Sequence, residues 1–280
     1  MSANTSLIAT KWLAANLNDP NIKIVDATWH LPNSDRKAAE EFKTAHIPGA
    51  IFFDIDEIAD LDTPLPHMMP NDEKMANRVR SMGISCTDHI IVYDNSDFCS
   101  AARVWFMFKN FGHENVSILD GGFQKWQKEG FDVDYKISDA NPSHFTAALN
   151  KDKIRSRDQI IYNIDSRKEQ LVDARSNGRF SGTAPEPRPD SKSGRIPGSF
   201  NVPFMDLLHE DNSYKSKEDI KAVFENSGVD LSRPIVTSCG SGITACILIF
   251  ALEHIGHSQN ALYDGSWTDW GTHPDTPVIK

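Results

Sequence analysis

Short apolar runs alternate with amphipathic segments along the whole chain, a pattern typical of strands that alternate with helices. Apolar runs bounded by turn residues predict strands at Ile22–Ala27, Ile51–Phe53, Ile90–Tyr93, Val116–Leu119 and Leu171–Ala174. Helical spacing predicts helices at Leu7–Leu17, Lys37–Lys43, Asn71–Met82, Ala101–Phe111, Phe123–Lys128, Ser156–Ile164 and Ile243–Leu252. Since parallel strands joined through helices form right-handed crossovers, we predict an α/β fold. Its sheets should be mostly parallel and covered by helices on both faces.

The same order of blocks occurs twice in the sequence. Ile91–Trp126 aligns without a gap on Ile235–Trp270, and nine of these 36 pairs are identical. Leu171–Ala174 resembles Ile24–Ala27, and the turn sequence Ile-Pro-Gly occurs once in each half. Several blocks that recur in one order indicate a duplication. The predicted parts are an N-terminal domain over residues 1–138, a linker over 139–155 and a C-terminal domain over 156–280.

One loop of the second half carries chemistry that the first half lacks. An apolar run ends at Thr237, the sequence Cys239-Gly240-Ser241-Gly242 follows, and a second apolar run begins at Ile243. This order predicts a strand, a tight loop and a helix. Two glycines let backbone N–H groups turn inward, and the helix N-terminus adds its positive dipole end, so the loop should stabilise a thiolate. The aligned residue of the first half is Asn95, and that half should keep the scaffold without the nucleophile.

Composition and charge narrow the class of protein. The net charge of −10 disfavours nucleic acid as a partner, because phosphate binding is mainly cationic. No apolar run reaches the roughly 18 residues of a membrane span, and Met1–Thr5 do not resemble the start of a targeting signal. Four cysteines without a C-x-x-C pair favour a reducing compartment, with the cytoplasm as the expected location. We find no nucleotide-binding glycine motif and no metal-ligand spacing, and therefore expect neither a cofactor nor a metal.

The duplicated halves and the cysteine loop together resemble the rhodanese superfamily and, more narrowly, its tandem-domain 3-mercaptopyruvate sulfurtransferases. The resemblance covers roughly Leu7 to Trp270. Besides the loop, the matching motifs are Phe52-Phe53-Asp54-Ile55-Asp56, Pro66-His67-Met68, Gly178-Arg179-Phe180, Glu186-Pro187-Arg188 and Asp264-Gly265-Ser266-Trp267. It implies two rhodanese-like domains, of which only the second is catalytic.

The resemblance also implies a reaction. Cys239 would take the sulfur of 3-mercaptopyruvate as a persulfide and release pyruvate, and then pass the sulfur to a thiol such as thioredoxin or glutathione, or to cyanide. Arg179 and Arg188 match the substrate-binding arginines of the family, and a guanidinium suits a planar carboxylate. The loop residues Gly240, Gly242, Ile243 and Thr244 would complete the substrate site. Ser241, His67 and Asp56 match a proposed proton relay to the departing group.

Three other functions remain to be weighed. A thiosulfate-preferring sulfurtransferase would resemble this chain but carry basic residues after the cysteine, where Gly240 and Ser241 are uncharged. A non-enzymatic persulfide carrier would not need both arginines. A cysteine phosphatase needs an arginine six residues after its nucleophile, and Ala245 stands there. We therefore expect mercaptopyruvate as the donor and weak thiosulfate turnover.

Overall fold

The computed structural model describes residues 6–137, 141–188 and 190–280. Two predictions concern residues outside these ranges: the absence of a targeting signal in Met1–Thr5 and the start of the linker at Asp139 and Ala140. The described chain forms two compact units. The first contains the chain up to Asp60 together with Met69–Asn150 and Glu210–Ser213, and the second contains Leu61–Met68, Lys151–His209 and Tyr214–Lys280. The domain limits predicted from the sequence stay a prediction. The structure adds that Leu61–Met68 belongs to the second unit and Glu210–Ser213 to the first.

The first unit is built on a five-stranded parallel sheet in the order β1-β5-β4-β2-β3. The strands are β1 (Leu7–Ile8), β2 (Ile22–Asp26), β3 (Ile51–Phe52), β4 (His89–Tyr93) and β5 (Val116–Leu119). The helices are α1 (Thr10–Asn16), α2 (Ala38–Thr44), α3 (Ile55–Ile58), α4 (Asp72–Ser81), α5 (Ala101–Asn110) and α6 (Gly122–Lys128). All parallel pairs are connected through helices, as the alternating pattern predicts.

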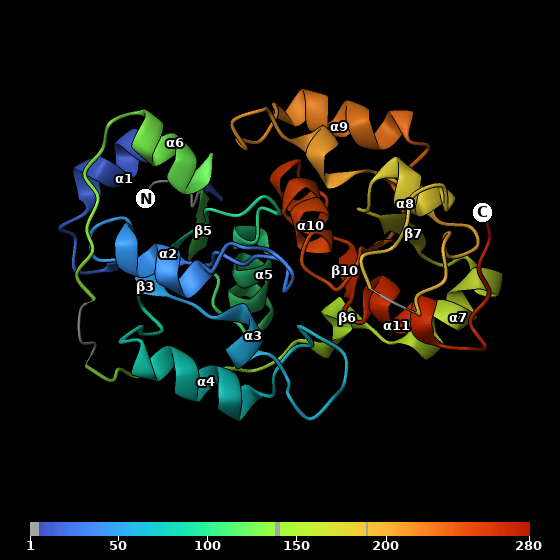
Figure 1. Ribbon diagram of the computed structural model, residues 1–280, viewed down its shortest axis with the longest axis horizontal. Coiled ribbons are helices and arrows are strands. Elements are labelled where there is room, and N and C mark those ends of the chain that lie inside the picture. The colour runs from blue at the N-terminus through green and yellow to red at the C-terminus, as the bar shows by residue number, and fades with distance from the viewer. Residues whose placement is uncertain (1–5, 138–140, 189) are drawn as a thin grey trace. The chain divides into compact units, whose positions relative to one another are not determined.

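Helices cover both faces of this first sheet (Figure 1). On one face, Ile24, Ile91 and Tyr93 pack in one core cluster with residues of α1, α2 and α6, including Trp126. On the other face, α5 packs along β4 and β5. Because side chains alternate along a strand, the two sets of strand residues point to opposite sides, and both sets must be apolar. This explains why the strands are mostly apolar rather than alternating between apolar and polar residues.

The second unit repeats this architecture with a parallel sheet in the order β6-β10-β9-β7-β8. The strands are β6 (Ile154–Arg155), β7 (Gln170–Asp173), β8 (Phe200–Asn201), β9 (Ile235–Ser238) and β10 (Asn260–Tyr263). The helices are α7 (Arg157–Ser166), α8 (Asn177–Ser181), α9 (Lys217–Asn226), α10 (Ala245–His254) and α11 (Ser266–Thr272), with 3₁₀ turns at Lys151–Lys153 and Phe204–Leu207. Residues of α7 and α11 share the core cluster of one face with Val236 and Tyr263, while α10 packs along β9 and β10.

The structure confirms the α/β class with two mostly parallel sheets and corrects several element limits. The helix predicted at Leu7–Leu17 is wrong at its start, because Leu7–Ile8 forms β1 beside β5. Ile154–Arg155, which the sequence assigned to the linker, forms β6 beside β10. Two helices begin at side-chain caps: the Asn71 side chain accepts the Lys74 N–H, and Ser156 forms a capping box with Gln159.

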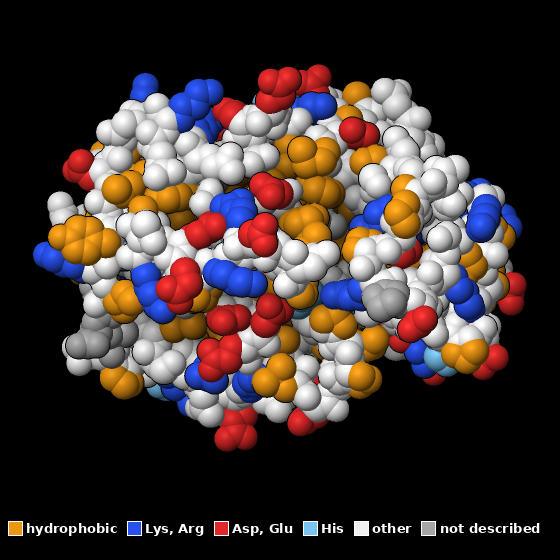
Figure 2. Space-filling view, viewed as in Figure 1, with side chains coloured by type: hydrophobic (Ala, Val, Ile, Leu, Met, Phe, Trp, Pro, Cys, Tyr) orange, Lys and Arg blue, Asp and Glu red, His pale blue; other side chains and the backbone are white. Residues whose placement is uncertain are grey.

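The surface carries charges of both signs. On the face in Figure 2, Lys and Arg side chains lie among Asp and Glu side chains rather than in one basic area. Within the ranges that the structure describes, no helix has the length and apolar character needed to cross a membrane.

Candidate active site

Cys239 lies directly after β9, at the point of the second sheet where the order of strand addition reverses. β9 pairs with β10 on one side and β7 on the other, and the chain leaves β9 and β7 toward opposite edges of the sheet. In open α/β sheets, this arrangement leaves a crevice beyond the carboxyl ends of the two strands, where ligands bind. Cys239 is only 2% exposed. The fold therefore places a sheltered thiol residue at the edge where such sheets bind their ligands.

The first turn of α11 holds the backbone at the start of the cysteine loop. The Cys239 N–H donates to Ser266 Oγ over 3.0 Å. In the opposite direction, Trp267 N–H donates to the Cys239 carbonyl (2.9 Å) and Thr268 N–H donates to the Gly240 carbonyl (2.8 Å). Because N–H groups in the first turn of a helix have no partner within the helix, they are available to fix the loop.

The loop turns one backbone donor toward the sulfur. Gly242 N–H donates to Cys239 Sγ over 3.2 Å. Gly242 has a φ of 81°, in the left-handed region that favours glycine. Ile243, which is 2% exposed, and Thr244 connect this turn to α10, and their carbonyls accept the first N–H groups of that helix. The predicted strand, tight loop and helix are thus all present, with Sγ inside the turn.

Arg179, in the short helix α8, lies beside the cysteine loop. Its Nη2 atom is 3.3 Å from the position that a Cβ atom on Gly240 would occupy. Glu186, whose side chain is 4% exposed, accepts from Arg179 Nη2 over 2.6 Å and also from Arg175 Nη1 over 2.8 Å. Arg175 in turn pairs with Asp173 over 2.7 Å. Two buried carboxylates therefore fix the guanidinium groups of Arg175 and Arg179, and the second of these lies next to the loop.

Arg188 reaches the same loop through one side chain. Its Nη1 atom donates to Thr268 Oγ1, and that hydroxyl donates to the Gly240 carbonyl over 2.7 Å. Arg179 and Arg188, both predicted from the sequence, thus lie next to the cysteine loop. What they bind there stays a prediction.

His67 belongs to the segment Leu61–Met68, which is part of the second unit. Its Nδ1 atom lies 3.0 Å from Ser241 Oγ and 3.3 Å from the Ser241 carbonyl oxygen. His67 is 4% exposed and has a φ of 61°, an unusual conformation for a non-glycine residue. The structure therefore brings together two of the three residues of the predicted relay.

Asp56 lies in the first unit, within α3. Its carboxylate accepts from Trp29 Nε1 over 3.2 and 3.1 Å. Its part in a relay with His67 stays a prediction.

The equivalent loop of the first unit is held in a different way. Asp94 accepts the N–H groups of Ser96 and Ala101, each over 2.8 Å. Burial raises the pKa of Asp94 to about 7, although these two hydrogen bonds favour its ionised form. The Asn95 side chain donates to Glu41, which also binds Arg36. This loop is thus filled by the unit's own polar side chains.

Four residues of the hydrogen-bond network beside the cysteine loop were missed by the sequence analysis: Arg175, Glu186, Ser266 and Thr268. The Glu-Pro-Arg motif contains Glu186, but only the arginine was assigned a role. Ser266 belongs to a motif used for the resemblance, and Thr268 follows it by two residues. For Ser266 and Thr268, the available signal was their position in the first turn of the helix after β10. The adjacent parallel strands β9 and β10 end at the same edge of the sheet, so this turn lies near the loop after β9.

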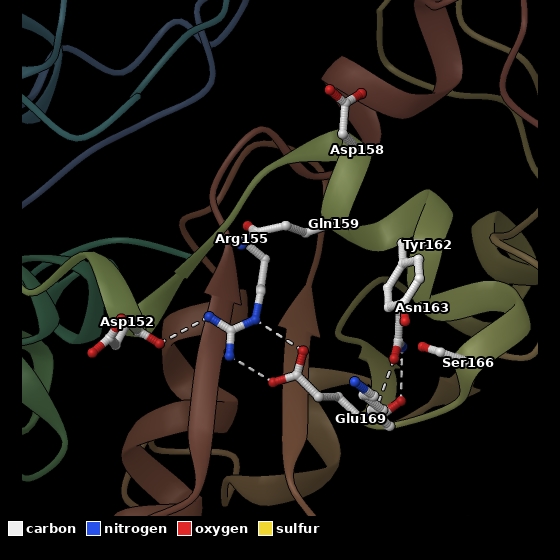
Figure 3. Close-up of a pocket in the computed structure, with 9 residues that line it drawn as sticks. Asp152, Arg155, Asp158, Gln159, Tyr162, Asn163, Ser166 and Glu169 are labelled. Atoms are coloured by element: carbon white, nitrogen blue, oxygen red, sulfur yellow. Dashed lines mark hydrogen bonds and ion pairs between the residues drawn. The ribbon is translucent and has the colours of Figure 1, made fainter.

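A separate hollow of about 580 Å³ lies along α7 of the same unit (Figure 3). Arg155 forms two hydrogen bonds with Glu169, and Asn163 bonds the Glu169 backbone in both directions. None of the residues lining it was predicted as a site residue. The Arg155–Glu169 pair thus connects β6 to the residue before β7, and the Asn163–Glu169 bonds connect α7 to that same residue.

Across the described ranges, no group of three or more His, Cys, Asp or Glu residues is arranged to hold a metal ion.

Comparison with known proteins matches both halves to one family. The profile described as "Rhodanese-like domain" matches residues 9–129 and 156–273, which together make up most of the chain. The chain belongs to the rhodanese family. Each match covers four of the five strands of one sheet, all but its first strand, so the duplicated halves are two rhodanese-like domains.

The relatives within this rhodanese family are named for more than one sulfur donor. Mouse 3-mercaptopyruvate sulfurtransferase is 44% identical over 95% of this chain and 91% of its own length. Rat thiosulfate sulfurtransferase is 42% identical over 98% of this chain and 95% of its own length. An Arabidopsis thaliana relative, 40% identical over 99% of this chain and 79% of its own length, is named as a mitochondrial thiosulfate/3-mercaptopyruvate sulfurtransferase. These relatives support an enzyme that transfers sulfur, and the cytoplasmic location stays a prediction.

Solved structures agree with this family assignment. The crystal structure of SseA from Escherichia coli, described as a 3-mercaptopyruvate sulfotransferase with the rhodanese fold, has a TM-score of 0.86 and is 37% identical. It is matched over 94% of this chain and 99% of that chain. Tum1 from Saccharomyces cerevisiae has a TM-score of 0.89 at 32% identity, over 99% of this chain and 98% of that chain.

Proposed function

We propose that this chain transfers the sulfur of 3-mercaptopyruvate, through a persulfide on Cys239, to a thiol acceptor or to cyanide, and releases pyruvate. The observation that carries the proposal is the hydrogen bond from Gly242 N–H to Cys239 Sγ, in a loop bordered by Arg179 and Arg188. An N–H group aimed at sulfur stabilises a thiolate, which is the reactive form of cysteine. The arginines supply charge for a substrate carboxylate.

In the first half-reaction, the Cys239 thiolate attacks the sulfur of mercaptopyruvate. A sulfur–sulfur bond forms and the carbon–sulfur bond of the donor breaks. The electron pair of the broken bond remains on the carbon as the enolate of pyruvate, which takes up a proton and leaves as pyruvate. This is covalent catalysis with a displaced first product, so a ping-pong kinetic pattern is expected.

In the second half-reaction, an acceptor thiolate attacks the outer sulfur of the persulfide. The sulfur–sulfur bond breaks, the acceptor becomes a persulfide, and Cys239 returns as a thiolate. Thioredoxin and glutathione are the proposed acceptors, and cyanide would leave as thiocyanate. Because Sγ is sheltered by its loop, the acceptor has to enter the same crevice as the donor.

The charge around the loop supports mercaptopyruvate as the donor. Asp173 and Glu186 are carboxylates that pair with the guanidinium groups of Arg175 and Arg179. The two residues directly after the cysteine, Gly240 and Ser241, carry no charge. The weaker positive field of such a loop suits the single carboxylate of mercaptopyruvate better than the two negative charges of thiosulfate.

Ser241 and His67 are proposed as the proton source for the enolate. Ser241 and His67 lie within hydrogen-bond distance of each other, and a serine that shares a proton with a histidine can deliver it to a neighbouring carbanion. Asp56 would orient the histidine, as the family resemblance implies.

Thiosulfate is the second candidate donor, because relatives named for thiosulfate are about as similar to this chain as those named for mercaptopyruvate. The two donors are compared through their kcat/KM values with one acceptor. We expect mercaptopyruvate to give the higher value. A higher value for thiosulfate would assign the chain to the second candidate.

Mass spectrometry tests the persulfide directly. After exposure to mercaptopyruvate without acceptor, the peptide that contains Cys239 should gain the mass of one sulfur atom, and an equal amount of pyruvate should appear. Cys86→Ser, which removes the exposed cysteine of the first unit, is the matched control and should behave like the unsubstituted protein. No mass gain in folded protein, or pyruvate release by Cys239→Ser, would overturn the proposal.

A further inference from the structure

The side chain of Thr268 connects the substrate-side arginine to the cysteine loop. Its hydroxyl accepts a hydrogen bond from Arg188 Nη1 and donates one to the Gly240 carbonyl over 2.7 Å. Gly240 directly follows the nucleophile Cys239 in the chain. A single hydroxyl thus links the Arg188 guanidinium to the backbone of the cysteine loop.

We propose that Thr268 is a positioning residue that sets the place of the Arg188 guanidinium relative to the cysteine loop. The proposal rests on the proposed function, since Arg188 is taken to bind the donor carboxylate. A hydroxyl has one hydrogen to donate, and here it is directed to Gly240. Its lone pairs therefore face the guanidinium, which can only donate. The direction of both bonds is thus fixed by the chemistry of the three groups.

The backbone of Thr268 has a different task from its side chain. Its N–H also donates to the Gly240 carbonyl, over 2.8 Å, and the N–H of the preceding Trp267 donates to the Cys239 carbonyl. Both bonds are independent of the side chain at position 268. Removing only the hydroxyl should therefore leave the loop anchored to α11 and disturb Arg188.

This separation predicts a defect in binding rather than in chemistry. Thr268→Val replaces the hydroxyl by a methyl group of similar size, which cannot accept from Arg188. Since hydrogen bonds to charged groups are among the stronger ones, the KM for mercaptopyruvate should rise about 10-fold. Binding that is equal in the ground and transition states affects KM and leaves kcat nearly unchanged, so kcat should change by less than about twofold.

Two further variants identify the hydroxyl as the cause. Thr268→Ser keeps the hydroxyl and loses the methyl group, so it should return KM close to the unsubstituted value. Thr272→Val is the matched control, because Thr272 lies on the same helix and loses a hydroxyl that bonds only the Thr268 carbonyl among its described partners. It should leave both constants unchanged. Equal KM values in Thr268→Val and the unsubstituted protein would overturn the proposal, and so would failure of Thr268→Ser to restore KM.

A second measurement follows Arg188 without any turnover. In protein with isotope-labelled arginine, the guanidinium N–H signals of Arg188, assigned with Arg188→Lys, should shift and exchange faster with water in Thr268→Val but not in Thr272→Val. Unchanged signals would overturn the positioning role whatever the substrate is. Altered signals in a protein that releases no pyruvate would keep the positioning role and reject mercaptopyruvate as the donor.

Discussion

Replacing Ser266 with Ala should weaken the cysteine loop, because one hydroxyl makes two buried hydrogen bonds there. Ser266 Oγ accepts from the Cys239 N–H over 3.0 Å and donates to the Tyr263 carbonyl over 2.8 Å. The residue has no measurable exposure. Water therefore cannot replace the lost partner without opening the structure, and the Cys239 N–H would be left without its acceptor.

The size of this effect follows from burial. A buried donor without a partner costs about 1–3 kcal/mol, so Ser266→Ala should lower the free energy of unfolding by about that amount. Ser266 also has a φ of 49°, a conformation that costs a non-glycine residue about 1 kcal/mol. Ser266→Gly removes this strain, but glycine gains about 0.5–1 kcal/mol of freedom in the unfolded chain. The two backbone effects nearly cancel, and both variants should be destabilised alike.

Urea denaturation of the two Ser266 variants tests this reasoning, with hydrogen exchange of the peptide that contains Cys239 as a local readout. Both variants should unfold at lower urea concentration and exchange faster at this peptide. Ser81→Ala is a suitable control, because the Ser81 hydroxyl is exposed and bonds a helix carbonyl of the first unit. Full stability of Ser266→Gly would refute this reasoning, because it would mean that the relief of backbone strain outweighs the loss of the hydroxyl in the free energy of unfolding.

Three other outcomes are expected. Arg188→Ala should raise the KM for mercaptopyruvate about 10- to 100-fold, the effect of losing a charge-assisted pair, and unchanged steady-state kinetics would remove Arg188 from the site. His67→Ala should slow turnover, and full activity from mildly acidic to mildly alkaline pH would contradict the relay. Burial raises the pKa of Asp94 from 3.8 to about 7. Between these values the folded state binds more protons than the unfolded chain, so stability should fall as pH rises through this window. Asp94→Asn should flatten that dependence, which urea denaturation at several pH values measures. If the free energy of unfolding changed with pH equally in Asp94→Asn and in the unsubstituted protein, Asp94 would not be the cause.

Most of the fold could be predicted from the sequence because the strands of these sheets are covered on both faces. Val116–Leu119 is apolar except for Ser117, and its limits agree with the structure. The edge strands β1 and β6 could not be found, because a strand of two residues shows no period and is defined by its neighbour. The helix α9 was left unassigned although a signal was present: Ser216 caps it, and Ile220 and Phe224 are buried one turn apart.

The candidate site was predictable where chemistry and chain position coincide. Cys239 stands in a glycine-rich loop after an apolar strand, and the structure has that turn. The role of Glu186 beside Arg179 could not be predicted from the sequence, because the six residues between them do not reveal that both side chains turn toward the same point. Arg175 was overlooked for a similar reason: its guanidinium is completely buried by two carboxylates and the ring of Trp267, whereas arginine is usually exposed.

A cysteine substituted into the loop of the first unit should not give this chain a second active site. In that unit the inward N–H groups of Ser96 and Ala101 are already occupied by the carboxylate of Asp94. A thiol introduced by Asn95→Cys would therefore face a negative or protonated carboxyl group in place of available donors, with Glu41 on its other side. It should gain no sulfur from mercaptopyruvate in the mass assay. A second active site would require removal of the Asp94 carboxylate from the turn before the cysteine is introduced. The loop of the first unit can therefore be used to test how many substitutions separate a non-catalytic rhodanese-like loop from a catalytic one.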